Sequence, residues 1–178
     1  MPPSSHLGAQ LSQVTTALRQ IGARYALIGG LALASHNVIR ATQDVDLLVD
    51  SEKADPIDAK LTELGYRCLH RSGDAGNYLR GDERVDLLYA HRPIAKRLLA
   101  AAAELNTSLG SLRVISAEGL IGFKLQGFVN DPRRTQDLED IRALLRANRG
   151  DLDLAEVRGY FDLFDRGPLL DELLRETA

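Results

Sequence analysis

The segment from Ile28 to Val49 is the most informative part of the chain, and it reads I-G-G-L-A-L-A-S-H-N-V-I-R-A-T-Q-D-V-D-L-L-V. A short apolar run, Tyr25 to Ile28, is expected to be a buried strand that ends in a pair of glycines. Leu31 to Val38 is expected to be helical. Asp44 to Asp50 is predicted to be a second strand from its β-branched and apolar content. The segment therefore predicts a strand, a glycine pair, a short helix and a strand, in that order.

Two carboxylates stand at the start of that second strand. Residues two apart on a strand share a face, so Asp44 and Asp46 should lie side by side. Like charges held close together either shift their pKa values or bind a cation, and Mg²⁺ favours such oxygen ligands. Asp86 lies within a further apolar strand, Arg84 to Tyr89, and would complete a two-metal site. The alternative is a strand edge with solvated aspartates.

The glycine pair before the helix has two interpretations. Without Cβ atoms, Gly29 and Gly30 allow the backbone to approach a phosphate closely, and the following helix supplies free N–H groups. Gly-Gly is also an ordinary turn.

The glycine pair, thirteen intervening residues and an Asp-Val-Asp strand resemble the signature of the DNA polymerase β-like nucleotidyltransferase superfamily. The words G-G-L-A-L-A and R-A-T-Q-D-V-D-L-L-V are most similar to the small bacterial branch that includes the abortive-infection nucleotidyltransferase toxins. The Gly-Gly form also occurs in antibiotic-modifying relatives, so the branch stays open. The signature positions are Gly29, Gly30, Asp44, Asp46 and Asp86.

The resemblance implies Mg²⁺-dependent transfer of a nucleoside monophosphate from an NTP to a hydroxyl group, with release of pyrophosphate. The three aspartates would hold two metal ions, and Asp86 would also help to deprotonate the acceptor. Gly29 and Gly30 would bind the β- and γ-phosphates. Arg40 and Thr42 directly precede the aspartates, and either could contact the nucleotide.

A second cluster lies further along the chain. Lys124 falls on an apolar helical stripe, where an ammonium is costly unless it is paired or functional. Asp137 falls on the inner face of another predicted helix. The patterns L-I-x-x-K-L and D-L-x-D-I are similar to later motifs of the abortive-infection toxins, which implies that Lys124 contacts the triphosphate and that Asp137 lies near the active site. The alternatives are that Lys124 extends to solvent and that Asp137 stabilises its helix N-terminus.

The pattern of elements predicts an α/β (α+β) fold in two parts. Residues 1–115 are expected to form a nucleotidyltransferase-like catalytic domain, with a mixed β-sheet flanked by helices. Residues 116–178 are expected to form a helical segment that packs over the nucleotide cleft. Within the first part, Pro93 to Leu105 is predicted to be one helix, and Cys68 is expected to be a small buried residue in a strand.

Composition limits the function classes. The chain has 178 residues, of which 44% are hydrophobic and 26% charged, as in globular proteins. Its net charge of −3 shows no basic excess for nucleic-acid or membrane binding. A single cysteine excludes an intramolecular disulfide, and no signal peptide or membrane span is recognisable, so a cytoplasmic location is expected.

The acceptor is left open by the sequence. A tRNA, a protein or a small molecule would each fit, and a toxin-like enzyme would have an antitoxin partner. A cationic aminoglycoside would need acidic residues around the acceptor, whereas a tRNA would need a basic rim, which the net charge does not support. An antibiotic-modifying nucleotidyltransferase and a non-catalytic nucleotide- or partner-binding module on the same fold are the alternatives.

Overall fold

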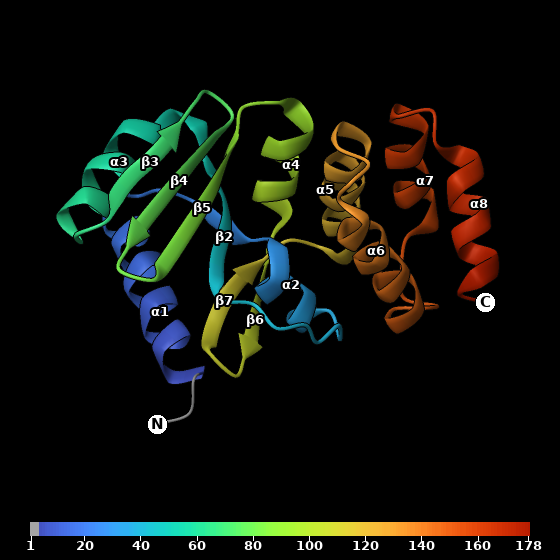
Figure 1. Ribbon diagram of the computed structural model, residues 1–178, viewed down its shortest axis with the longest axis horizontal. Helices are drawn as coiled ribbons and strands as arrows, with labels where there is room; N and C mark the ends of the chain where they lie inside the picture. The colour runs from blue at the N-terminus through green and yellow to red at the C-terminus, as the bar shows by residue number, and fades with distance from the viewer. Residues whose placement is uncertain (1–3) are drawn as a thin grey trace. The chain divides into compact units, whose positions relative to one another are not determined.

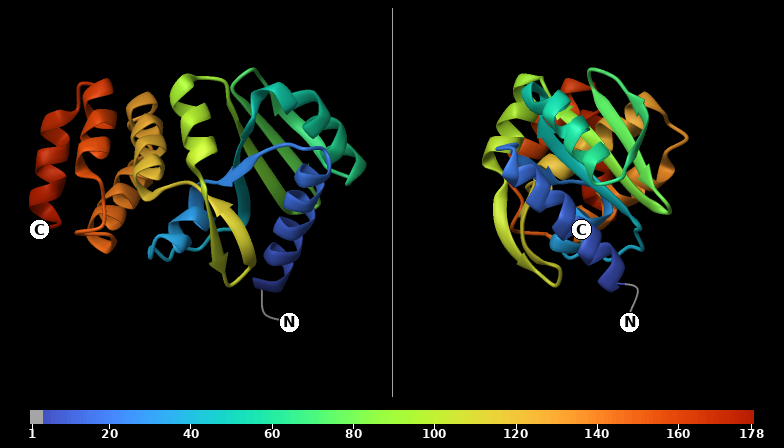
Figure 2. Two further views of the ribbon diagram at one scale, coloured as in Figure 1. Left: turned by 180° about the vertical axis from the view of Figure 1, so that it is seen from behind. Right: turned by 90° about the vertical axis from the view of Figure 1, so that its left-hand side faces the viewer.

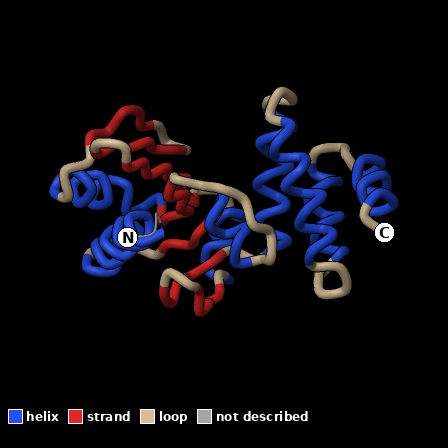
Figure 3. Tube along the Cα trace, turned by 60° about the horizontal axis from the view of Figure 1, so that its bottom comes forward, coloured by secondary structure: helices blue, strands red, loops and turns tan. Residues whose placement is uncertain are grey.

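The computed structural model describes residues 4–178 and divides into two compact units (Figure 1). Unit 1 comprises the chain up to Leu31 together with Ala41–Ile115, and unit 2 comprises Ala32–Arg40 and Ser116–Ala178. The strands all belong to unit 1, whereas the regular elements of unit 2 are helices (Figure 3). The change at residue 116 thus coincides with a boundary between units, but a short segment before Ala41 groups with the later helices.

Unit 1 is built on a seven-stranded mixed sheet with the order β3-β4-β5-β2-β1-β7-β6. The central strand β2 is parallel to β5 and antiparallel to β1, which is in turn parallel to β7. The strands are β1 (Tyr25–Leu27), β2 (Asp44–Asp50), β3 (Arg67–Arg71), β4 (Ala75–Arg80), β5 (Glu83–Ala90), β6 (Ala103–Thr107) and β7 (Gly110–Val114).

One face of the sheet forms the core of unit 1. The alternating residues Val45, Leu47, Val85 and Leu87 are at most 1% exposed. Two helices, α1 (Ser4–Gln20) and α3 (Ala54–Glu63), lie across this side of the sheet (Figure 2). Each buried Val or Leu side chain contributes about 1.5–3 kcal/mol. Because side chains alternate along a strand, the residues in between, Asp46 and Asp86 among them, fall on the opposite face.

The remaining elements of unit 1 begin and end at recognisable residues. The chain turns after α1 at Gly22, whose φ of 65° favours glycine. Helix α4 (Pro93–Ala101) starts at a proline, whose missing N–H has no intrahelical partner at that position in any case. The short helix α2 (Gly29–Ser35) and the 3-10 turn η1 (Ser51–Lys53) connect the central strands to the next elements.

Unit 2 contains α5 (Ala117–Asn130), α6 (Thr135–Ala147), α7 (Leu154–Leu163) and α8 (Gly167–Glu176). Ser116 caps α5, since its side chain accepts a hydrogen bond from the Gly119 N–H at 3.1 Å. The segment before Ala41 is held to α6 by Asn148, whose side-chain amide donates to the His36 carbonyl at 3.0 Å. No helix within residues 4–178 has the length and hydropathy needed to cross a bilayer.

Two local expectations are wrong. The helix predicted over Pro93–Leu105 ends at Ala101, and the next residues form β6. Alanine-rich sequence favours a helix, but pairing with β7 through a tight turn overrides that local preference. Cys68 is exposed, because all five residues of the edge strand β3 are exposed.

Tyr78 gives the fold a predicted sensitivity to alkaline pH. Its side chain is fully buried, and its hydroxyl donates to Asp58 Oδ1 at 2.8 Å. Burial is the main cause that raises the pKa of Tyr78, and the neighbouring Tyr89 and Asp58 add to it. A pKa raised above the unfolded value of about 10 leaves stability intact below that pH and lowers it as the pH rises further.

We therefore expect the free energy of unfolding to fall above pH 10, by up to about 1.4 kcal/mol per pH unit for this one group. Tyr78→Phe should lower stability at pH 7, because it removes a hydrogen bond, but should flatten the alkaline decline. Urea unfolding at intervals from pH 8 to 11 measures both effects. Parallel stability curves for the two proteins would contradict the assignment.

Candidate active site

The three predicted aspartates stand on one face of neighbouring strands. The register of β2 and β5 sets Asp46 opposite Asp86 and Asp44 opposite Arg84. Residues directly opposite one another in a sheet share a face, with Cβ atoms about 5 Å apart. Asp46 and Asp86 are therefore side by side, while the nearest β5 neighbour of Asp44 is a cation. All three carboxylates are half-buried.

The glycine pair packs against this site. Gly29 has a φ of 69°, and a Cβ on it would lie 2.6 Å from Asp46 Cγ and closer still to Oδ2. A Cβ on Gly30 would lie 2.7 Å from Thr42 Cβ. The Ile28 N–H also donates to the Asp46 carbonyl at 3.0 Å. Both glycines thus have a structural reason that is independent of any phosphate: they let the start of α2 lie directly against Asp46 and Thr42.

The close packing of Asp46 on Gly29 predicts that a methyl group added at residue 29 destabilises the protein. Gly29→Ala should lower the free energy of unfolding by at least 1–2 kcal/mol, roughly the cost of a left-handed backbone for an L-residue, and should push the Asp46 carboxylate aside. Urea unfolding measures the first effect, and titration with MgATP and MgGTP measures the second.

Gly159→Ala is the matched control, because a Cβ on this α7 glycine would meet nothing within 4 Å. Replacing glycine by alanine inside a helix should stabilise the protein by about 1 kcal/mol. If Gly29→Ala were as stable as Gly159→Ala, the close packing of Asp46 on Gly29 would be wrong.

Lys124 and Asp137 meet in a buried ionic network inside unit 2. The Lys124 ammonium lies 3.1 Å from Asp137 Oδ1 and 2.9 Å from Asp140 Oδ2. The Lys124 side chain is 11% exposed, so the alternative in which it extends to solvent is wrong. Arg134 approaches Asp137 Oδ2 at 2.7 Å, and Gln136 donates to Asp140 Oδ1 at 3.0 Å. The lysine on the apolar stripe is therefore neutralised by two aspartates of α6.

Arg40 is attached to the same network. Its guanidinium lies 3.5 Å from Asp140 Oδ2, and it lines a groove of about 340 Å³ in unit 2, beside Arg142 and Arg146. Thr42, two residues later, belongs to unit 1 and packs on Gly30. The roles of Arg40, Thr42, Lys124 and Asp137 in nucleotide binding stay predictions.

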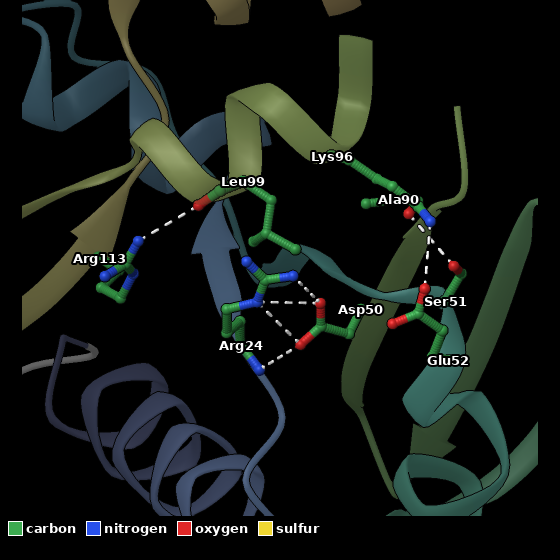
Figure 4. A network of polar contacts seen from close by, with 8 residues as sticks. All are labelled: Arg24, Asp50, Ser51, Glu52, Ala90, Lys96, Leu99 and Arg113. Atoms are coloured by element: carbon green, nitrogen blue, oxygen red, sulfur yellow. Dashed lines mark hydrogen bonds and ion pairs between the residues drawn. The ribbon is translucent and has the colours of Figure 1, made fainter. Parts of the chain in front are cut away.

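Asp50, the last residue of β2, is paired with Arg24. Its carboxylate accepts from the Arg24 guanidinium at 2.7 Å and from the Arg24 backbone N–H at 2.8 Å (Figure 4). The carboxylate hydrogen bond raises the pKa of Arg24. The carboxylate at the end of D-V-D-L-L-V-D is thus engaged by one arginine.

One residue of the candidate site was not predicted from the sequence. Asn77 on β4 lies opposite Asp86, and its side-chain amide donates to Asp86 Oδ1 at 2.7 Å. The signal was present, because the Gly81-Asp82 turn pairs Arg80 with Glu83 and so fixes which β4 residue faces Asp86.

The donor chemistry fits a magnesium ion. Within residues 4–178, no three His, Cys, Asp or Glu side chains form a ready metal-binding group. Mg²⁺ is usually held by one or two carboxylates, with waters and substrate phosphates as its other ligands, rather than by a complete protein cage. The adjacent Asp46 and Asp86 supply that kind of open, all-oxygen site, and Asp44 lies two residues away on the same strand face.

One family model and several solved structures are similar to this chain. A family model described as aminoglycoside-2''-adenylyltransferase matches residues 10–80, which is less than half of the chain and stops before Asp86. Among curated proteins, no match was found.

Several solved structures are similar. The solution structure of the antibiotic-resistance factor ANT(2'')-Ia has a TM-score of 0.68 at 18% identity, over 94% of this chain and 96% of that one. The crystal structure of ANT(2'')-Ia with adenylyl-2''-tobramycin has a TM-score of 0.67 at 18% identity, over 89% and 96%. The lincosamide adenylyltransferase LnuA, bound to lincomycin, has a TM-score of 0.57 at 15% identity, over 76% and 94%.

The chain therefore has a nucleotidyltransferase fold, as the sequence predicts. Within that fold, the family match and the similar structures named above are antibiotic adenylyltransferases. The finer resemblance to the abortive-infection toxins stays a prediction.

Proposed function

We propose that this protein is a Mg²⁺-dependent nucleotidyltransferase that moves a nucleoside monophosphate from an NTP to a hydroxyl group of an antibiotic-like small molecule. The observation that supports the chemistry is the pairing of Asp46 with Asp86 on adjacent strands. The acceptor class is supported by the family match and by the antibiotic-modifying enzymes that share the fold.

The reaction is a displacement at the α-phosphorus of the NTP. The acceptor oxygen bonds to phosphorus as the bond from phosphorus to the bridging oxygen breaks, and pyrophosphate leaves with that oxygen. The hydroxyl proton passes to the Asp86 carboxylate and then to solvent. Phosphoryl transfer of this kind depends mainly on positioning and charge neutralisation.

The residues of the chain take complementary roles. Asp44, Asp46 and Asp86 would hold Mg²⁺, which when bound neutralises charge on the phosphates. Gly29 keeps the start of α2 against Asp46, and so fixes the position of that carboxylate relative to the backbone. The backbone around Gly29 and Gly30 would then lie close to the triphosphate.

The test is to incubate the protein and Mg²⁺ with each α-labelled NTP and four acceptor sets: aminoglycosides, lincosamides, bulk tRNA and lysate proteins. We expect label in an antibiotic fraction and release of pyrophosphate, with neither for Asp86→Asn. Label confined to tRNA or protein would overturn the acceptor class and favour a toxin-like enzyme. No transfer with any NTP would overturn the activity and favour a non-catalytic module.

A further inference from the structure

We propose that Asn77 is a positioning residue that orients the Asp86 carboxylate for metal binding. This inference rests on the proposed function, because it gives Asp86 a metal to bind. The observation behind it is the 2.7 Å hydrogen bond from the Asn77 amide to Asp86 Oδ1.

The strand register of β4 and β5 fixes the position of Asn77 beside Asp86. Gly81 has a φ of 62° and, with Asp82, forms the two-residue turn that joins β4 to β5. Counting back from the turn, Asn77 is paired with Asp86. The donor is therefore held by strand pairing rather than by a mobile loop.

Asp86 stands between two different neighbours on the same face of the sheet. On one side β2 presents Asp46, and on the other side β4 presents Asn77. Like charges directly opposite one another destabilise a sheet, and they push the two carboxylates apart. A hydrogen bond from the other side holds Asp86 in one rotamer despite that repulsion.

The chemistry of the donor suits this task. An amide N–H carries no formal charge, so it fixes a carboxylate without cancelling the negative charge that attracts a cation. An ionised carboxylate has two oxygens with about four acceptor positions. The bond occupies Oδ1, which leaves Oδ2 for the metal or for the acceptor proton. A lysine or arginine at residue 77 would instead compete with the metal.

The expected effect follows from metal sites in general, where removal of a group that orients a ligand weakens metal affinity by 10- to 100-fold. Asn77→Leu keeps the approximate size of the side chain and removes the donor. We expect it to weaken binding of Mn²⁺, used as a paramagnetic substitute for Mg²⁺, by about tenfold or more.

The experiment is a Mn²⁺ titration followed by electron paramagnetic resonance, in the presence of a non-hydrolysable NTP, so that no acceptor is needed. Asn106→Leu is the matched control, because Asn106 is an exposed residue of β6 in the same sheet. Its Mn²⁺ affinity should equal that of the wild type. Asn77→Ala, which has no side-chain donor, should repeat the loss if Asn77→Leu fails to fold.

A double variant separates positioning from general disturbance. If Asn77 acts through Asp86, then Asn77→Leu combined with Asp86→Asn should bind Mn²⁺ no more weakly than Asp86→Asn alone. Additive losses would overturn the inference, and so would a wild-type affinity in Asn77→Leu. A wild-type protein that binds no Mn²⁺ with any NTP would instead overturn the proposed function.

Discussion

Asp46→Asn should abolish nucleotide transfer while the protein stays folded. The substitution is nearly isosteric, so the side chain still fits against Gly29, but it removes the charge of a carboxylate that we propose binds the metal. Metal ions supply several kcal/mol of transition-state stabilisation, and each 1.4 kcal/mol is tenfold in rate. We expect a loss of about a thousandfold or more in pyrophosphate release, measured in a single turnover.

Although Asp46→Asn should abolish transfer, it should not lower the stability of the protein. Removing one of two like charges that face each other across β2 and β5 relieves their repulsion, so the metal-free melting temperature should stay equal or rise slightly. Asp82→Asn, in the exposed turn between β4 and β5, is the control and should keep full activity. A variant Asp46→Asn with wild-type transfer would refute metal binding by Asp46, and an unfolded one would make the carboxylate structural.

Among the substitutions considered, Lys124→Met should cause the largest decrease in the free energy of unfolding. The methionine keeps the apolar stem but leaves Asp137 and Asp140, 4% and 2% exposed, without their shared ammonium. Removing one partner of a buried ion pair costs about 3–5 kcal/mol, because the remaining charge stays buried. Urea unfolding at pH 7 measures the difference from the wild type.

Two further variants test whether the loss of stability in Lys124→Met comes from the buried network. Lys96→Met removes an ion pair with Glu52 in which both side chains are largely exposed, and such pairs contribute about 0–1 kcal/mol. Adding Asp140→Asn to Lys124→Met should restore part of the lost stability, since it removes one of the two buried carboxylates that lose the ammonium. If Lys124→Met cost no more than Lys96→Met, the buried network would not be the main role of the lysine.

The same variant bears on nucleotide binding. If Lys124 also contacts the triphosphate, the folded Lys124→Met protein should bind MgNTP about 10- to 150-fold more weakly, as expected for the loss of a charge-assisted contact. An unchanged dissociation constant would limit Lys124 to neutralising the two aspartates of α6.

Local sequence signals were sufficient where the structure depends on neighbours along the chain. The glycine pair and the β-branched and apolar content of D-V-D-L-L-V-D each predict a feature that the structure contains. The hairpin turn at Gly81-Asp82 is a further local signal, because it determines that Asn77 faces Asp86.

Tertiary structure determines features that local sequence preferences do not predict. Ala103–Thr107 follows alanine-rich sequence and becomes a strand only because β7 pairs with it. Cys68 lies in a strand that looks half-apolar, yet it is exposed because β3 is at the edge of the sheet.

The sequence by itself determined the nucleotidyltransferase fold, the pair of carboxylates on β2 and the presence of a cation on an apolar helical stripe. It could not determine that Asp86 falls opposite Asp46, or that Lys124 is neutralised by Asp137 and Asp140, because those partners are far apart along the chain. Periodicity tells which face a residue occupies, since that depends on backbone geometry alone. Which residue it meets there depends on strand register and helix packing, and these are set by the burial of many side chains together.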